Sequence, residues 1–513
     1  MASSSSSDDD DDIEREAATA EVPLLSEWRD GPHSDEPGSL YGYRQNVVIL
    51  CLAIVLLISL GAGVLTPPLN ALLEDIICRQ YHPEVAAGPG VLSNDPMCKY
   101  PDVQGRLAII RGWATTFDCI PGILGAVPYG ILSDKWGRKP VMALSLIGFA
   151  LSVAYICLVV WLPDVFPLWS IWFSSAFMLI GGSTSVAQAM LYTVVADVVP
   201  VAERATVFFQ IVSTFLVASM IGSPLAGVLM RRSPWIALLT GLGLLVLSTI
   251  TSFAVPETLH FNKPGDNLEA GSDQDDDLDT ATLAHDPKDS ELRKLITKAR
   301  EDLAEIWKFI IGNKDIAFLL ISIVFVVLGK FVQEMLLQYA SKRFGWSWDE
   351  AAIFLTIHGA GNLVVLIVLL PAVSWLCMNY LKMSAPAKDL WLARISGIIL
   401  VAGAVMIAFS ANALVLSFAL IIFAGGAGLT SLLRSLMNSL VEAHHVGTLN
   451  SLIGFMENVG LMIAGPTLSE ALRIGIELGG PWIGLPFLCA ALLFSVSTAV
   501  VWAFRMPGRG QSA

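Results

Sequence analysis

Long apolar runs alternate with short polar gaps along the chain. A helix needs about 20 apolar residues to cross a hydrocarbon core roughly 30 Å thick. Segments of that kind lie at about 46–66, 107–131, 140–162, 169–194, 206–229 and 235–255, and after a polar gap at 316–339, 351–375, 393–410, 413–436, 449–470 and 482–504. The pattern predicts an all-α polytopic membrane protein with twelve transmembrane helices in two six-helix bundles.

The polar segments divide the chain into domains. Residues 1–42 are rich in Ser and Asp and predict a disordered acidic tail. The two bundles are expected over 43–257 and 315–505, with a linker at 258–314 and a short tail at 506–513. Within the linker, apolar positions recur at helical spacing over about 291–311, which predicts an amphipathic helix on the membrane surface or against the bundle.

Composition and charge agree with this division. The chain is 54% hydrophobic and 15% charged, which is typical of a membrane protein. Residues 1–36 hold twelve acidic and two basic residues, and 266–302 hold twelve and five, so these segments carry −17 and the remainder +3. The acidity therefore belongs to the polar segments, and the absence of a basic face excludes a nucleic-acid partner. No signal peptide is expected before the first apolar run.

A charged turn separates the second and third apolar runs. It reads Gly130-Ile-Leu-Ser-Asp-Lys-Trp-Gly-Arg-Lys-Pro140, and its charged residues mark the edge of the membrane because they are costly in hydrocarbon. Pro140 suits the first turn of the next helix. The turn resembles the loop signature G-x-L-a-D-r-x-G-r-k of the major facilitator superfamily, with matches at Gly130, Leu132, Asp134, Gly137, Arg138 and Lys139.

The resemblance implies an orientation and a role. The loop is expected in the cytoplasm, and the even number of spans then places both termini there, whereas Lys and Arg counts alone favour neither orientation. Asp134 and Arg138 are expected to form a conformational latch that favours the outward-open state. Asp197 is the expected partner of Arg138, and the helix start near Thr448 is expected to face Asp134.

Further stretches, among them Leu65–Asn70, Val255–Thr258 and Gln338–Trp346, resemble fungal-type members of the superfamily, tetracycline or drug:proton antiporters and, distantly, proton-coupled folate-type carriers. This implies a proton-coupled secondary transporter of a small organic solute, with efflux favoured over uptake. Proton-coupled import and a transporter-like nutrient sensor stay as alternatives. The antiporter motif is matched only in part, because Ser223 stands where the family has Gly.

Breaker residues fall at corresponding places in the fifth and eleventh spans. They are expected either to kink these helices around a midplane site or simply to allow close helix contact. The residues are Gly222, Pro224, Gly227, Gly465 and Pro466.

Charged and polar residues inside the spans are candidates for the mechanism, because a charge at the bilayer centre costs about 2.5–3.5 kcal/mol on insertion scales. Glu457 is the first candidate for proton coupling, Asp118 the second with Arg111 as partner, and His358 the third. Each has an alternative as a paired or hydrogen-bonded structural group. Arg434 is expected to extend to the interface. Candidates for lining the substrate cavity are Gln188, Lys330, Glu334, Asn362 and Asn458; Lys330 and Glu334 are expected to pair.

The remaining chemistry is sparse. Cys78 and Cys98 fall in one external loop and either form a disulfide or stay free. The sequence contains no recognisable metal-ligand cluster, nucleophile–base set or phosphate loop, so neither an enzyme nor a cofactor is expected. The expected partners are the solute, protons and the lipid bilayer, and the protein is expected to be a monomer in the plasma or vacuolar membrane.

Overall fold

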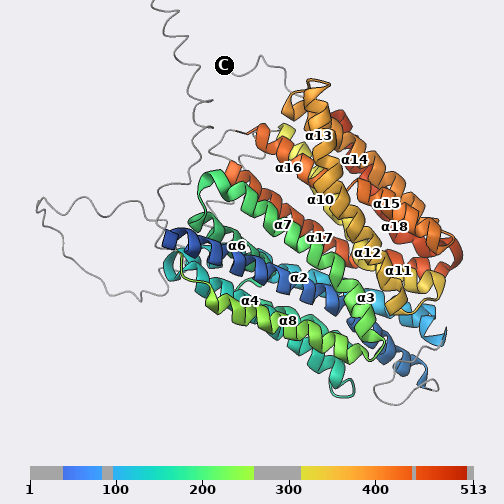
Figure 1. Cartoon of the computed structure of the whole chain (residues 1–513). Coiled ribbons are helices and arrows are strands. Elements are labelled where there is room, and N and C mark those ends of the chain that lie inside the picture. The colour runs from blue at the N-terminus through green and yellow to red at the C-terminus, as the bar shows by residue number, and fades with distance from the viewer. Residues whose placement is uncertain (1–37, 84–95, 259–313, 442–445, 505–513) are drawn as a thin grey trace, which may run out of the picture. The chain divides into compact units, whose positions relative to one another are not determined.

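The computed structural model describes residues 38–83, 96–258, 314–441 and 446–504 (Figure 1). The chain divides into two compact units, Met1–Ile49 and Leu50–Ala513. Of the first unit the described residues form the start of one helix, and all that follows concerns the second unit. The predicted acidic tail up to residue 37, the amphipathic helix of the linker and the last nine residues lie outside the described residues.

Regular structure in the described ranges is helical, and twelve of the helices there are long and apolar enough to cross a membrane. This confirms the predicted all-α polytopic fold. We call the first six spans the first half. They comprise α2 (Gly38–Tyr81), α3 (Pro101–Trp136), α4 (Arg138–Trp161), the continuous run of η3 (Leu168–Phe173), α5 (Ser174–Met178) and α6 (Ser183–Val198), then α7 (Val201–Met230) and α8 (Pro234–Ala254).

The last six spans form the second half. They comprise α10 (Lys314–Lys330) with α11 (Val332–Phe344), α12 (Trp348–Val364) with a π-helical turn (Val365–Leu369) and α13 (Leu370–Asn379), α14 (Ala385–Ala408), α15 (Ala413–Gly425) with α16 (Leu429–Ser439), α17 (Val446–Leu478), and η7 (Gly480–Gly484) with α18 (Leu485–Ala503). Figure 1 shows these helices in colours from blue for α2 to red for α18.

Local chemistry explains several helix starts. Proline occupies the first turn of α3 and of α8, where an N–H has no helical acceptor. The Ser233 hydroxyl accepts from the Trp235 N–H and caps α8. Ser347 and Glu350 form a capping box at the start of α12, which fixes where that helix begins.

The first span is longer than its sequence predicts. The apolar pattern ends at residue 66, before Pro67 and Pro68, yet α2 continues through both prolines to Tyr81. A proline removes one donor, and neighbouring helices can compensate for such a loss in a membrane protein. The extension brings Glu74 and Cys78 onto a helix, whereas the apolar pattern predicts that the first span ends at residue 66.

The two halves contact each other mainly along α3 with α17 and α7 with α12. The α3–α17 contact has almost no side chain between the backbones, because Gly112 faces Gly465. The Thr116 hydroxyl also donates to the Met462 carbonyl oxygen at 2.9 Å. We call the end of the helices that holds residues 74–83 and 96–104 the disulfide end, and the end that holds residues 130–140 the loop end. Gly112 lies nearer the disulfide end.

We expect Gly112→Val to destabilise the protein, because the added Cβ would lie 2.6 Å from the Gly465 carbonyl oxygen and closer still to Ser469. Overpacking of this kind costs about 1–3 kcal/mol. The measurement is the thermal unfolding midpoint of the purified protein in detergent. Gly243→Val is the matched control, since nothing lies within 4 Å of a Cβ at that position. Equal midpoints for the two variants would contradict the close approach of α3 and α17.

Candidate functional site

A cavity of about 670 Å³ opens between α2, α3, α4, α6, α7 and α17. It brings together three of the predicted residues, Asp118, Gln188 and Asn458, which come from α3, α6 and α17. The other lining residues are mostly apolar. Asp118 is the one charged residue among those that line this cavity, and its side chain is exposed to it.

Arg111 lies two turns before Asp118 on α3 and lines a smaller, adjoining cavity with Glu334 of α11. It is close enough to attract both carboxylates electrostatically. Glu334, in the second half, has the larger electrostatic effect on Arg111, and Asp118, the predicted partner, has the smaller one.

Glu457 faces a different cavity, of about 510 Å³, lined mainly by polar residues of α16. Its carboxylate forms an ion pair with Arg434, with Nη2 to Oε1 at 2.9 Å. Arg434, predicted to extend to the interface, instead holds the carboxylate predicted for proton coupling. Because neighbouring residues of a helix point about 100° apart, Glu457 and Asn458 face separate cavities.

Lys330 does not form the predicted pair with Glu334 and binds residues of the α15–α16 region instead. The helix is interrupted at Phe331, so the two residues do not share one continuous helical face. Lys330 donates to the Ala427 carbonyl oxygen at 3.1 Å and to Thr430 Oγ1 at 2.9 Å. These bonds supply acceptors for the half-buried Lys330 ammonium group at the turn between α15 and α16.

His358 and Asn362 lie on one face of α12 as predicted. His358 Nε2 is 3.2 Å from Asn362 Nδ2, and the ring is 5.7 Å from that of Phe423. His358 is buried, and its Nδ1 has no hydrogen-bond partner among the described residues. This group packs against α15 and does not line the cavity that holds Asp118.

Arg138 is the centre of the loop end. Its Nη1 donates to Ser133 Oγ at 2.8 Å and to Asp134, and its Nε lies 3.6 Å from Asp197 Oδ2. The carboxylate of Asp197 is almost fully buried and also accepts from the Thr258 hydroxyl at 3.2 Å. The structure therefore places both predicted carboxylates on Arg138, and all these residues belong to the first half.

Glu257 is a functional candidate that the sequence did not reveal. Its carboxylate accepts from the backbone N–H of Arg138 at 2.8 Å and of Lys139 at 3.2 Å, at the start of α4. A negative charge is favourable at the positive end of a helix. Gly137 has φ +111° and lies so close to this carboxylate that a Cβ would collide with it, whereas Gly130 has open space around it. Of these two positions, only 137 has a backbone geometry and a close neighbour that require glycine.

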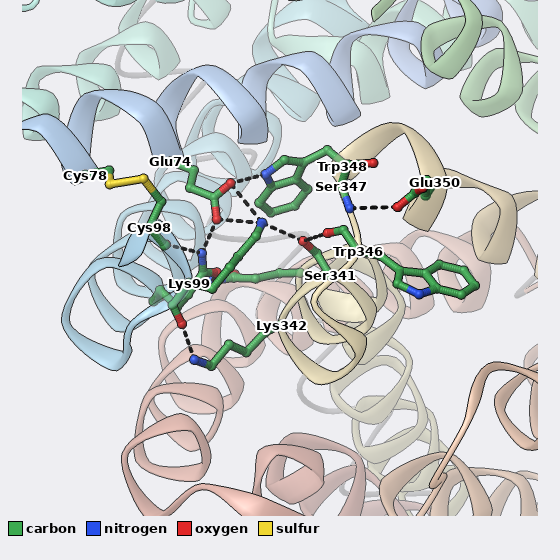
Figure 2. Close-up of polar contacts among 12 residues, drawn as sticks. Glu74, Cys78, Cys98, Lys99, Ser341, Lys342, Trp346, Ser347, Trp348 and Glu350 are labelled. Atoms are coloured by element: carbon green, nitrogen blue, oxygen red, sulfur yellow. Dashed lines mark hydrogen bonds and ion pairs between the residues drawn. A yellow bond between two sulfur atoms is a disulfide. The ribbon is translucent and has the colours of Figure 1, made fainter. Parts of the chain in front are cut away.

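Glu74 is the centre of the disulfide end (Figure 2). Its carboxylate is buried and pairs with Lys99, whose Nζ lies 2.7 Å from Oε1. It also accepts from Gln104 Nε2 and from the indole N–H of Trp348. Lys99 and Gln104 belong to the first half and Trp348 to the second, so one carboxylate is bonded to both halves.

Further bonds join the halves around Glu74. Lys99 Nζ donates to Ser341 Oγ at 2.7 Å, and Lys342 donates to the Lys99 carbonyl oxygen. Gln338 Nε2 donates to the Gln104 carbonyl oxygen at 2.8 Å. A disulfide joins Cys78 on α2 to Cys98 in η2 (Pro96–Lys99), next to Lys99 (Figure 2).

The breaker residues lie inside continuous helices, Gly222, Pro224 and Gly227 in α7 and Gly465 and Pro466 in α17. Gly222 faces Gly63 of α2 closely enough that a Cβ would lie 2.9 Å from the Gly63 Cα, and Gly465 faces Gly112. Close helix contact, one of the two interpretations of this pattern, is therefore present.

This architecture defines a polytopic helical membrane protein of the transporter type. The sequence matches the Major Facilitator Superfamily over residues 110–465, and the chain belongs to that family. It is 32% identical to the MFS efflux pump atnC of Emericella nidulans, over 97% of this chain and 95% of that protein. It is 29% identical to the class C tetracycline resistance protein of Escherichia coli, over 39% of this chain and 43% of that protein.

A solved structure of a point mutant of the nucleoside transporter NupG superposes with a TM-score of 0.61 at 12% identity, covering 89% of this chain and 98% of that one. The likeness shows the fold. Together these findings confirm the predicted membership of the superfamily and an integral multi-pass membrane protein.

We expect Glu257→Ala to loosen the start of α4, because two backbone N–H groups lose their acceptor. Loss of a helix cap costs about 0.5–2 kcal/mol. Hydrogen exchange measured by mass spectrometry should quicken in peptides that cover 138–145. Glu203→Ala, an exposed glutamate in the first turn of α7, serves as the control. Unchanged exchange at 138–145 would contradict the cap.

Proposed function

We propose that the protein is a secondary active transporter that moves a small organic solute by alternating access, coupled to protons, with export favoured over import. The observation that carries this proposal is the cavity of about 670 Å³, which is large enough for a small solute. It lies beside the interface of the two halves, and hydrogen bonds close that interface at the disulfide end. The bonds of Glu74, Lys99 and Gln104 to the second half form that closure. A transporter needs a central site that can open to either side in turn.

The loop end is proposed to face the cytoplasm, with both termini on the same side. This orientation rests on the family resemblance of the loop around Asp134. In it, Arg138, Asp134 and Asp197 form the conformational latch, and Glu257 holds the start of α4 in place. The disulfide end then faces the outside or a vacuolar lumen, where an oxidising environment stabilises a disulfide.

Export is supported by the relatives. The protein from Emericella nidulans is named an efflux pump, and the bacterial relative is named a resistance protein. An exporter that works against a gradient needs an energy source, and exchange for protons is the class of coupling that a carboxylate within a membrane span can provide. The solute, protons and the surrounding lipid are the proposed partners of a monomeric protein.

Glu457 is the proposed coupling residue. Its ion pair with Arg434 joins α17 to α16, so protonation of the carboxylate removes the attraction between these helices. In a fully buried ion pair, removing one charge lowers the stability of the protein by several kcal/mol. The loss is smaller here, because both side chains are partly exposed. Asp118 and His358 are the other candidates, and Asp118 faces the solute cavity directly.

The solute has to be found before coupling can be measured. A fungal strain that lacks the gene is screened for growth on a panel of toxic compounds, and flux of the active compound is then followed in proteoliposomes. An exporter should protect the cells and move the compound against its gradient when a pH difference is imposed. An importer would sensitise the cells, and a sensor would bind the compound without moving it; either result would overturn export.

We expect Glu457→Gln to abolish flux driven by a pH difference, because glutamine mimics the protonated side chain and cannot release a proton. Exchange of labelled for unlabelled solute should persist, since it needs no net proton movement. Glu477→Gln is the matched control, a glutamate of the same helix that pairs with Arg473 at an exposed position. Full pH-driven flux in Glu457→Gln would remove this residue from the coupling role.

A further inference from the structure

The charge of the central cavity indicates which solutes it takes. Asp118 is the one charged residue among its lining residues, and it faces the open volume. Resting on the proposed transport function, we propose that the solute is an amphipathic organic cation, a protonated amine or similar group on an apolar body, with Asp118 as its counter-charge.

The walls of the cavity fit such a molecule. About 670 Å³ lies within the range of roughly 300–1,000 Å³ that small-molecule sites occupy. Aliphatic side chains and the rings of Phe149, Tyr192 and Phe215 provide apolar surface, and an aromatic face attracts a cation. Gln188 and Asn458 offer amide groups that can orient the polar part of the solute.

Arg111 does not cancel this preference. It lines the neighbouring cavity and is attracted by Glu334 as well as by Asp118. The guanidinium group is not among the residues that line the larger cavity, so Asp118 is the charge that a bound cation meets there. An anion meets a carboxylate in apolar surroundings, where the repulsion is stronger than in water.

The test compares two ions of matched shape and opposite charge, tetraphenylphosphonium and tetraphenylborate. Binding to the purified full-length protein is measured by equilibrium dialysis in detergent. We expect the cation to bind at least roughly tenfold more tightly than the anion, a difference of about 1.4 kcal/mol. Asp118→Asn should remove that difference, and Asp118→Glu should restore it.

Asp164→Asn, a carboxylate in the exposed turn after α4, is the control and should bind both ions as the native protein does. Equal binding of the two ions by the native protein, or a full cation preference in Asp118→Asn, would overturn the cationic class. Either result would leave transport itself standing, because the growth screen and the pH-driven flux assay presume no charge on the solute.

The cluster at the disulfide end supports a second, independent inference. Resting on the proposed transport function and orientation, we propose that Glu74 and Lys99 form the outer gate, and that the Cys78–Cys98 disulfide holds Lys99 against Glu74 while the gate opens. The distribution of the bonds between the two halves carries this proposal (Figure 2).

The Glu74–Lys99 ion pair lies within the first half. The bond from Glu74 to the second half comes from a neutral donor, the indole N–H of Trp348. When the halves separate, Glu74 loses the Trp348 indole but keeps Lys99 and Gln104. Leaving a buried charge without its ion-pair partner costs more than losing one hydrogen bond to a charged group. The gate can therefore open without leaving a bare charge.

The disulfide maintains this arrangement. Cys78 follows Glu74 by one turn of α2, and Cys98 directly precedes Lys99. The bond thus ties the segment that carries the cation to the helix that carries the anion. Its reduction frees Lys99 to leave Glu74, which weakens the bonds of Lys99 and its carbonyl group to Ser341 and Lys342.

We expect Trp348→Phe to shift the protein toward opening at the disulfide end, because phenylalanine keeps an aromatic ring but lacks the N–H. Hydrogen exchange of the full chain should quicken roughly five- to tenfold in peptides covering 70–81 and 346–352. It should slow in peptides covering 130–140, because the loop end closes as the other end opens. A variant that is merely destabilised would exchange faster at both ends.

Trp346→Phe is the matched control, since the Trp346 ring stacks on Phe354 and only its carbonyl oxygen joins the cluster. A reductant should act on the native protein in the same direction as Trp348→Phe, with no further effect on Cys78→Ser/Cys98→Ser. Unchanged exchange, or faster exchange at both ends, would overturn the gate.

Discussion

A buried ion pair is costly to separate, and this cost limits how two halves of a membrane protein can move against each other. In this protein the pairs of Lys99 with Glu74 and of Arg138 with Asp197 lie within the first half, and that of Arg434 with Glu457 within the second. Arg231 and Asp349 form an ion pair across the halves, but the arginine is largely exposed, where such a contact contributes little. The halves can therefore separate at the disulfide end while their internal pairs stay intact.

Because the buried ion pairs lie within the halves, close contact between helix backbones has to hold the two halves together. Lipid tails are as apolar as leucine, so helices in a membrane associate through packing and hydrogen bonds. Gly112 with Gly465 provides such a contact between the halves, and Gly63 with Gly222 provides one within the first half. A contact without side chains tolerates a change of angle better than an interlocked one, which suits a pivot. The Thr116 hydroxyl adds one directed bond at the same place.

The sequence predicts the fold well because hydrophobic length is a local property, and it predicts the Arg138–Asp197 contact through a family motif. It fails where the determinant is distant in the chain. Glu257 caps α4 from a position 118 residues later, and no spacing rule reveals that Gly137 leaves this helix without its own cap. The sequence does not reveal the role of Glu74, because the apolar pattern stops before Pro67 and Pro68 while the helix continues beyond them. The i, i+4 spacing of Lys330 and Glu334 predicts a pair only in an unbroken helix, and the helix is interrupted at Phe331.

Helix α17 links the proposed solute and proton sites. Glu457 and Asn458 are neighbours in sequence but face different cavities, one bounded by α16 and one by the helices of the first half. The same helix packs along α3, which carries Asp118. A change in the Glu457–Arg434 pair would alter how α17 is held within the second half, and a solute at Asp118 would press on its other face. In this scheme the two events are coupled by the position of a rigid helix, so no direct contact between proton and solute is required. The two binding steps then influence each other only as far as each prefers one position of α17.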